Sequence, residues 1–142
     1  MEKVIKYRSG YKYQLAQDYL IFVNIFPERD IMAGYIRLSR KGLLIIRRGY
    51  AWDGPSGPTI DTHTFMRGSL VHDVLYQLIR QGFLKPEDRL LADLELKKIC
   101  EEDGMAKFRI WWVYKALRKF ANFAALPESR KKIKSAPKEI KC

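Results

Sequence analysis

Short apolar segments alternate with turn residues along the first third of the chain, at a spacing of roughly ten residues. The segments are rich in aromatic and β-branched residues and lie at 11–15, 19–23, 31–38 and 43–47. Turn sequences at 27–30 and 40–42 separate the later ones. This pattern predicts an antiparallel meander of strands over residues 1–48, with the aromatic side chains packed on one sheet face.

Apolar residues in the second half recur at the three-and-four spacing that is typical of amphipathic helices. We predict helices over residues 64–81, 86–102 and 106–123. Gly82 follows the first helix as a C-terminal stop, and Pro86 stands at the first position of the second. The short connection between them predicts an antiparallel helical hairpin.

The predicted fold class is therefore α+β, with an N-terminal antiparallel β-sheet followed by a three-helix C-terminal half. With 142 residues, of which 47% are hydrophobic, the chain can bury one ordinary core. We place a single globular domain over residues 1–126. Residues 127–142 are rich in Lys and poor in core residues, which predicts a basic flexible tail.

A loop dense in Gly and Pro, residues 49–63, joins the strands to the helices and is expected to lack regular structure. Hard cations such as calcium take oxygen ligands, which are often backbone carbonyls together with a carboxylate. Gly54 and Gly57 would let the backbone turn its carbonyls inward. Asp53 would add a side-chain oxygen, and Asp73 would be the anchoring carboxylate. The alternative is an ordinary turn-rich connection.

The first helix carries a His-Asp pair, His72 and Asp73. An imidazole acts as a general base near neutral pH when a carboxylate fixes its tautomer. Consecutive helical residues point about 100° apart, so one of the pair would position a water and the other would bind a cation. Asp93 on the second helix would hold the imidazole by its other nitrogen, and Tyr76 would bond the same carboxylate. The alternative is a structural network of interior polar groups, with Asp73 on the surface.

The net charge of +11 favours acidic partners, either nucleic acid or anionic lipid. The last sixteen residues contribute +4 of this charge, so most of it lies on the body of the protein. The third helix mixes aromatic residues with Lys and Arg, a composition that suits a membrane interface or nucleic-acid stacking. Because aromatics at helical spacing are more often core, we expect them to be buried. No nucleic-acid-binding motif is present.

Several other classes of protein do not fit the sequence. The two cysteines, Cys100 and Cys142, do not form the pattern of a disulfide framework or a thiolate zinc site. No apolar run reaches about 18 residues, so no transmembrane helix is expected. The N-terminal residues lack the apolar core of a signal peptide. We therefore expect a protein made in a cytoplasm, with incorporation into a particle as a further destination.

The order of loop, His-Asp pair and distant Asp resembles the site of phospholipase A2, notably the compact disulfide-free form in parvovirus capsid proteins. The shared pattern is Tyr-x-x-x-Gly-Pro-x-Gly from Tyr50 to Gly57, His-Asp-x-x-Tyr from His72 to Tyr76, and Ala-Asp ending at Asp93. The resemblance implies calcium bound by the Tyr50 to Gly57 loop and by Asp73. It implies His72 as the base, supported by Asp93 and Tyr76, in the hydrolysis of phospholipid esters.

A second resemblance, over about residues 10 to 120, is to a phage and prophage family called domain of unknown function 1353. The residues that carry it are Gly49, Tyr50, Asp53, Gly54, Ser56, Pro58, His72, Asp73, Leu75, Tyr76, Ala92 and Asp93. It implies a phage-borne protein made in the host cytoplasm. The expected partners are anionic membrane lipid or other phage structural proteins, with nucleic acid less favoured. The alternative to a hydrolase is a non-enzymatic virion protein of the tail, baseplate or capsid, or an assembly protein, in which the His/Asp/Tyr cluster is structural.

Overall fold

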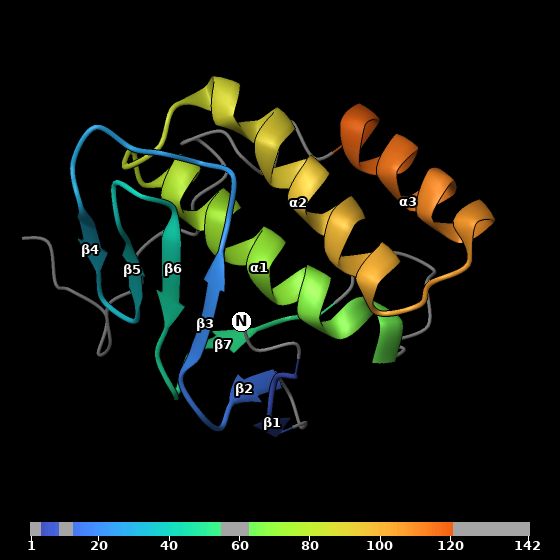
Figure 1. Ribbon diagram of the computed structural model, residues 1–142, viewed down its shortest axis with the longest axis horizontal. Coiled ribbons are helices and arrows are strands. Elements are labelled where there is room, and N and C mark those ends of the chain that lie inside the picture. Colours follow the sequence, from blue (N-terminus) through green and yellow to red (C-terminus); the bar gives the residue numbers. More distant parts are fainter. Residues whose placement is uncertain (1–3, 9–12, 55–62, 121–142) are drawn as a thin grey trace, which may run out of the picture.

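A computed structural model describes residues 4–8, 13–54 and 63–120 of the chain. In this part of the protein, the strands form two antiparallel sheets in the N-terminal half, and three α-helices form the C-terminal half (Figure 1). The predicted α+β class in a single domain is therefore confirmed. The prediction of one continuous meander is wrong, because the strands divide between two sheets.

The smaller sheet has the strand order β1-β2-β7, with bounds β1 (Tyr7–Arg8), β2 (Tyr13–Leu15) and β7 (Ala51–Trp52). Strand β7 lies inside the segment 49–63 that we expected to lack regular structure, so this expectation is wrong at residues 51–52. The physical reason is burial. The Trp52 ring is almost fully buried and contacts the Tyr13 ring at 5.7 Å between centroids. Burial of this large aromatic side chain outweighs the turn-rich composition around it.

The larger sheet has the order β3-β6-β5-β4, with bounds β3 (Tyr19–Phe22), β4 (Ile31–Ala33), β5 (Ile36–Leu38) and β6 (Leu43–Ile46). Alternate side chains of its strands are buried against α1. The single strand predicted over 31–38 is instead a hairpin, in which Ala33 pairs with Ile36. Gly34 makes the turn with a φ of 60°, a left-handed conformation that favours glycine.

The helices are α1 (His63–Arg80), a short 3-10 turn η1 (Pro86–Asp88), α2 (Arg89–Glu102) and α3 (Lys107–Phe120). The predicted bounds agree closely, except that the second helix opens with the 3-10 turn. The residues predicted to extend the third helix to 123, and the predicted tail 127–142, lie outside the described residues. None of the helices in the described part has the length and apolarity needed to cross a bilayer.

Helix α1 is the central element, with the larger sheet on one side and α2 on the other (Figure 1). Helix α2 runs antiparallel to it, as the short connection predicted. Gly68 of α1 allows this close approach, because a Cβ there would lie 3.0 Å from Cys100 Sγ. The central helix is therefore buried on nearly all sides, including the side that carries its polar residues.

A buried arginine ties α1 to the end of α2. Arg67 donates hydrogen bonds to Glu102 and Asp103, both at 2.8 Å, and to the Tyr19 hydroxyl at 2.9 Å. A buried cation needs such partners, because desolvation without them is costly. This network was not predicted from the sequence.

Helix α3 packs on the other helices through Ile110 and Val113, which are both buried. Its large aromatic residues Phe108, Trp111 and Trp112 are instead 78%, 55% and 42% exposed. The expectation that these aromatics belong to the core is therefore wrong. The two aliphatic residues fill the contact with α1 and α2, so the aromatics lie on the opposite side of the helix.

Candidate functional site

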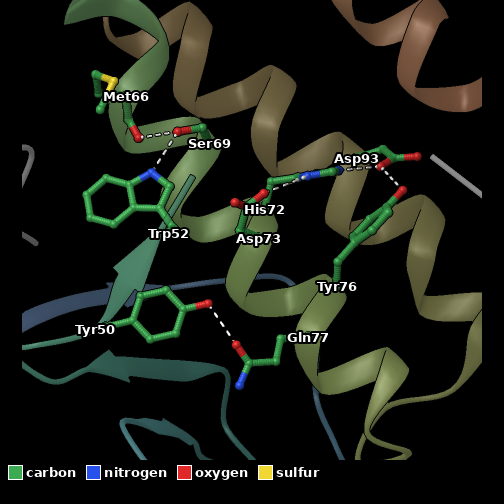
Figure 2. A network of polar contacts seen from close by, with 9 residues as sticks. All are labelled: Tyr50, Trp52, Met66, Ser69, His72, Asp73, Tyr76, Gln77 and Asp93. Carbon is green, nitrogen blue, oxygen red and sulfur yellow. Dashed lines mark hydrogen bonds and ion pairs between the residues drawn. The ribbon is translucent and has the colours of Figure 1, made fainter. Parts of the chain in front are cut away.

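The centre of the candidate site is a contact between α1 and α2. His72 Nε2 lies 2.8 Å from Asp93 Oδ1, and both side chains are buried (Figure 2). The antiparallel hairpin brings these two residues together, since each lies within about two helical turns of the connection between α1 and α2. The predicted pairing of His72 with Asp93 is confirmed.

Tyr76, one helical turn after His72, donates its hydroxyl to the same Asp93 oxygen at 2.6 Å (Figure 2). Its ring also lies against the imidazole, with 4.1 Å between the ring centroids. Burial, and then the bond to Asp93, raise the pKa of Tyr76 above its usual value. The hydroxyl therefore stays protonated and serves as a donor, as the sequence predicted.

A third partner of Asp93 comes from α3 and was not predicted. Arg118 donates from a guanidinium nitrogen to Asp93 Oδ2 at 2.8 Å. Burial alone would raise the pKa of Asp93, but the bonds from His72, Tyr76 and Arg118 outweigh it and lower that pKa. The sequence carries only a weak signal for this contact. Arg118 directly follows Leu117, which packs on the core, but it is one of five basic residues in the helix.

The charge of Asp93 decides the tautomer of His72. A charged carboxylate can only accept hydrogen bonds, so we assign the imidazole proton to Nε2. The lone pair is then on Nδ1, which lies 4.0 Å from Asp73 Oδ1 and is too distant for a direct hydrogen bond. The orientation is that of a general base held from behind by a carboxylate.

Asp73 lies at the edge of the site, with 39% of its side chain exposed. Partial burial raises the pKa of Asp73 to about 6; the neighbouring His72 and the charge of Arg80 oppose this, and the charge of Asp53 adds to it. The predicted ligands Asp53 and Asp73 are thus within electrostatic range of each other. A cation between two such carboxylates would relieve their repulsion.

Both oxygens of Tyr50 form hydrogen bonds within the fold. Its hydroxyl donates to Gln77 Oε1 at 2.9 Å (Figure 2), and its carbonyl accepts from the Leu15 amide at 2.8 Å. Burial, followed by the charge of Asp73, raises the pKa of Tyr50. Tyr50 therefore joins β2 and β7 to α1, and its role as a calcium ligand stays a prediction.

The remaining calcium-loop residues are described only in part. Gly54 has a φ of 80°, consistent with the sharp turn that we predicted there, and Gly57 lies outside the described residues. Among the residues that are described, no three His, Cys, Asp or Glu side chains group as a metal site. The calcium prediction thus depends on backbone oxygens in addition to Asp53 and Asp73.

Trp52 anchors the start of this segment on α1, a role that sequence reasoning missed. Its indole nitrogen donates to Ser69 Oγ at 3.1 Å, and Ser69 donates to the Met66 carbonyl at 2.8 Å (Figure 2). Ser69 precedes His72 by nearly one turn, so the anchor lies beside the site. The signal available was a large aromatic residue in a segment otherwise made of turn residues.

Comparison with family models, with curated proteins and with solved structures gives no match to this chain in any of the three. The functional argument therefore depends on the geometry of the site.

Proposed function

We propose that the protein is a metal-assisted ester hydrolase of the phospholipase A2 type that acts on phospholipids. The observation that carries the proposal is the 2.8 Å contact between His72 Nε2 and Asp93 Oδ1, which leaves Nδ1 of the imidazole as the basic atom beside Asp73. This is the arrangement needed to take a proton from a water molecule.

In the proposed reaction, His72 Nδ1 removes a proton from a water that attacks the carbonyl carbon of the ester. Asp93 and Tyr76 hold the imidazole in place, and the negative charge of Asp93 stabilises the imidazolium that forms. The proton then passes from His72 to the leaving alcohol. Asp73 and Asp53, with loop oxygens, would hold calcium, which when bound supplies positive charge for the developing oxyanion.

The test is fatty-acid release from phospholipid vesicles by the purified protein, with calcium and with a chelator. We expect release that requires calcium and is lost in His72→Gln. The chain has two histidines, and His63→Gln is the matched control, because His63 is exposed at the start of α1. Asp73→Asn should lose the response to calcium. Absence of release by the unaltered protein with calcium would overturn the proposal.

The burial of the site favours a second candidate, a non-enzymatic protein in which the His/Asp/Tyr cluster is structural. Asp93 is fully buried and bonded to His72, Tyr76 and Arg118, as expected for a network that fixes three helices together. From the sequence resemblance alone, we propose that such a protein would be a phage virion or assembly protein. The second candidate is favoured if the unaltered protein lacks lipase activity while His72→Gln lowers the free energy of unfolding by about 1–3 kcal/mol.

A further inference from the structure

The outward side of α3 carries large aromatic residues that nothing in the described structure covers. Trp111 and Trp112 follow Phe108 by three and four residues, so all three lie on one face of the helix. Lys115 and Lys119 extend the same face and are also exposed. We call these five residues the outer stripe of α3. Exposed apolar groups gathered in this way mark interaction sites on protein surfaces.

The position of α3 leaves its outer stripe accessible. Helix α2 lies between α3 and α1, and α3 is the outermost helix on its side of the molecule (Figure 1). Its opposite face, with Ile110 and Val113, fills the contact with the other helices. Core packing therefore does not account for the large aromatic residues on the outer face of this helix.

The charge of α3 indicates the kind of partner. Within residues 107–120 there are five Lys or Arg and no Asp or Glu. A helix with Trp and Phe on one face and Lys beside them is the composition of helices that lie in the interface of an anionic membrane. The rings would enter the boundary between headgroups and acyl chains. The lysines would keep their ammonium groups among the anionic headgroups.

The arrangement of the rings favours lipid over nucleic acid. Phe108 and Trp111 are stacked, with 6.5 Å between their centroids and an interplanar angle of 27°. Lys115 Nζ lies over the Trp111 ring, 5.2 Å from its centroid. Base stacking needs an open ring face, and Lys115 already lies over one face of Trp111. Insertion into a membrane interface needs only exposed apolar area, which the three aromatic residues supply.

We propose that the outer stripe of α3 docks the protein on membranes that contain anionic lipid. Phe108, Trp111 and Trp112 insert at the interface, and the lysines contact the headgroups. The proposal requires no catalysis and stands apart from the proposed hydrolase activity. If both hold, the docked helix is also the one whose Arg118 contacts Asp93 in the candidate site.

The test uses the full chain and vesicles of diether phospholipids, which lack the ester bond, in the presence of a chelator. We expect sedimentation with vesicles of diether phosphatidylglycerol and phosphatidylcholine, and weak binding to phosphatidylcholine alone. Binding should shift tryptophan emission to shorter wavelength. Of the three tryptophans, Trp52 is already buried, so the shift reports on Trp111 and Trp112.

The double variant Phe108→Ser/Trp111→Ser should bind roughly tenfold or more weakly. Both residues are exposed, so its melting temperature should match that of the unaltered protein. The control is Phe26→Ser, because Phe26 is 62% exposed but lies between β3 and β4. This control variant should bind as the unaltered protein does.

Three results would overturn the docking proposal. The first is that the unaltered protein does not bind anionic vesicles. The second is that the Phe108→Ser/Trp111→Ser variant binds them equally well. The third is that the unaltered protein binds an oligonucleotide and not the vesicles, and that the variant no longer binds the oligonucleotide. Failure of the hydrolase proposal is distinguishable from these. The hydrolase proposal fails if the protein does not hydrolyse a short-chain phospholipid ester that is dissolved as monomers, because this substrate requires no membrane docking.

Discussion

His72 Nε2 and Asp93 Oδ1 are 2.8 Å apart, although 21 positions separate the two residues in sequence. The contact joins α1 to α2 inside the protein and determines which imidazole nitrogen carries the proton. The contact therefore has a place in both the stability and the chemistry that we propose. The predictions below separate these two roles and test the structure around them.

The stability that Asp93 contributes should depend on pH. The fold lowers the pKa of this carboxyl from an ordinary value of about 3.9, so the fold favours its charged form. The contribution is then full above that ordinary value and is lost as pH falls through the lowered value. We expect Asp93→Asn to lower the free energy of unfolding by about 1–3 kcal/mol at neutral pH. Urea unfolding of both proteins should show this difference shrinking below about pH 4, and a difference that grows there would contradict the assignment.

Arg118 should stabilise the protein through Asp93. Arg118→Gln removes a donor from a buried carboxylate and should cost about 1 kcal/mol or somewhat more, since the arginine itself is 32% exposed. Arg37→Gln is the matched control, because Arg37 is exposed on β5. In a protein that already carries Asp93→Asn, the Arg118→Gln cost should be smaller. Equal costs in the two backgrounds would show that the pair is not coupled.

Ser69 should matter as the acceptor for the Trp52 indole. Ser69→Ala leaves the buried Trp52 N–H without this partner and should lower the free energy of unfolding by about 1–3 kcal/mol. The double variant Trp52→Phe/Ser69→Ala removes both groups, so its cost should be less than the sum of the single costs. Chemical denaturation of all four proteins measures this. Strict additivity would show that the hydrogen bond contributes nothing.

Gly54 should tolerate alanine less well than Gly82. Both have a left-handed backbone, with φ of 80° and 82°. A Cβ on Gly54 would come within 2.4 Å of the Tyr13 ring, whereas a Cβ on Gly82 would meet nothing within 4 Å. We expect Gly82→Ala to cost about 1 kcal/mol from the backbone alone and Gly54→Ala to cost about 1–3 kcal/mol more. Thermal unfolding of the two variants decides the matter, and similar losses would contradict the close packing on Tyr13.

The parts of the site that could be predicted are those set by helical geometry. His72 and Tyr76 are one turn apart, and a short connection places Asp93 opposite them. These relations follow from residue spacing within two neighbouring helices. The contact of Asp93 with both side chains was predictable for this reason.

The parts that could not be predicted depend on segments distant in sequence. Arg118 reaches Asp93 from a third helix, and Trp52 reaches Ser69 from a strand. Neither contact produces a periodic pattern in the sequence. The local spacing of apolar and polar residues would be the same if Arg118 and Trp52 faced solvent.

The amino-acid sequence alone determined the fold class, the three helices and the His72–Asp93 pair, since periodicity and short connections act over neighbouring residues. Three features depend on the packing of the whole chain: β7 joins the smaller sheet, Arg118 contacts Asp93, and the aromatics of α3 face outward. Each of these depends on which surfaces are covered when distant segments pack. Burial of a side chain is a property of the whole fold, so local spacing cannot specify it.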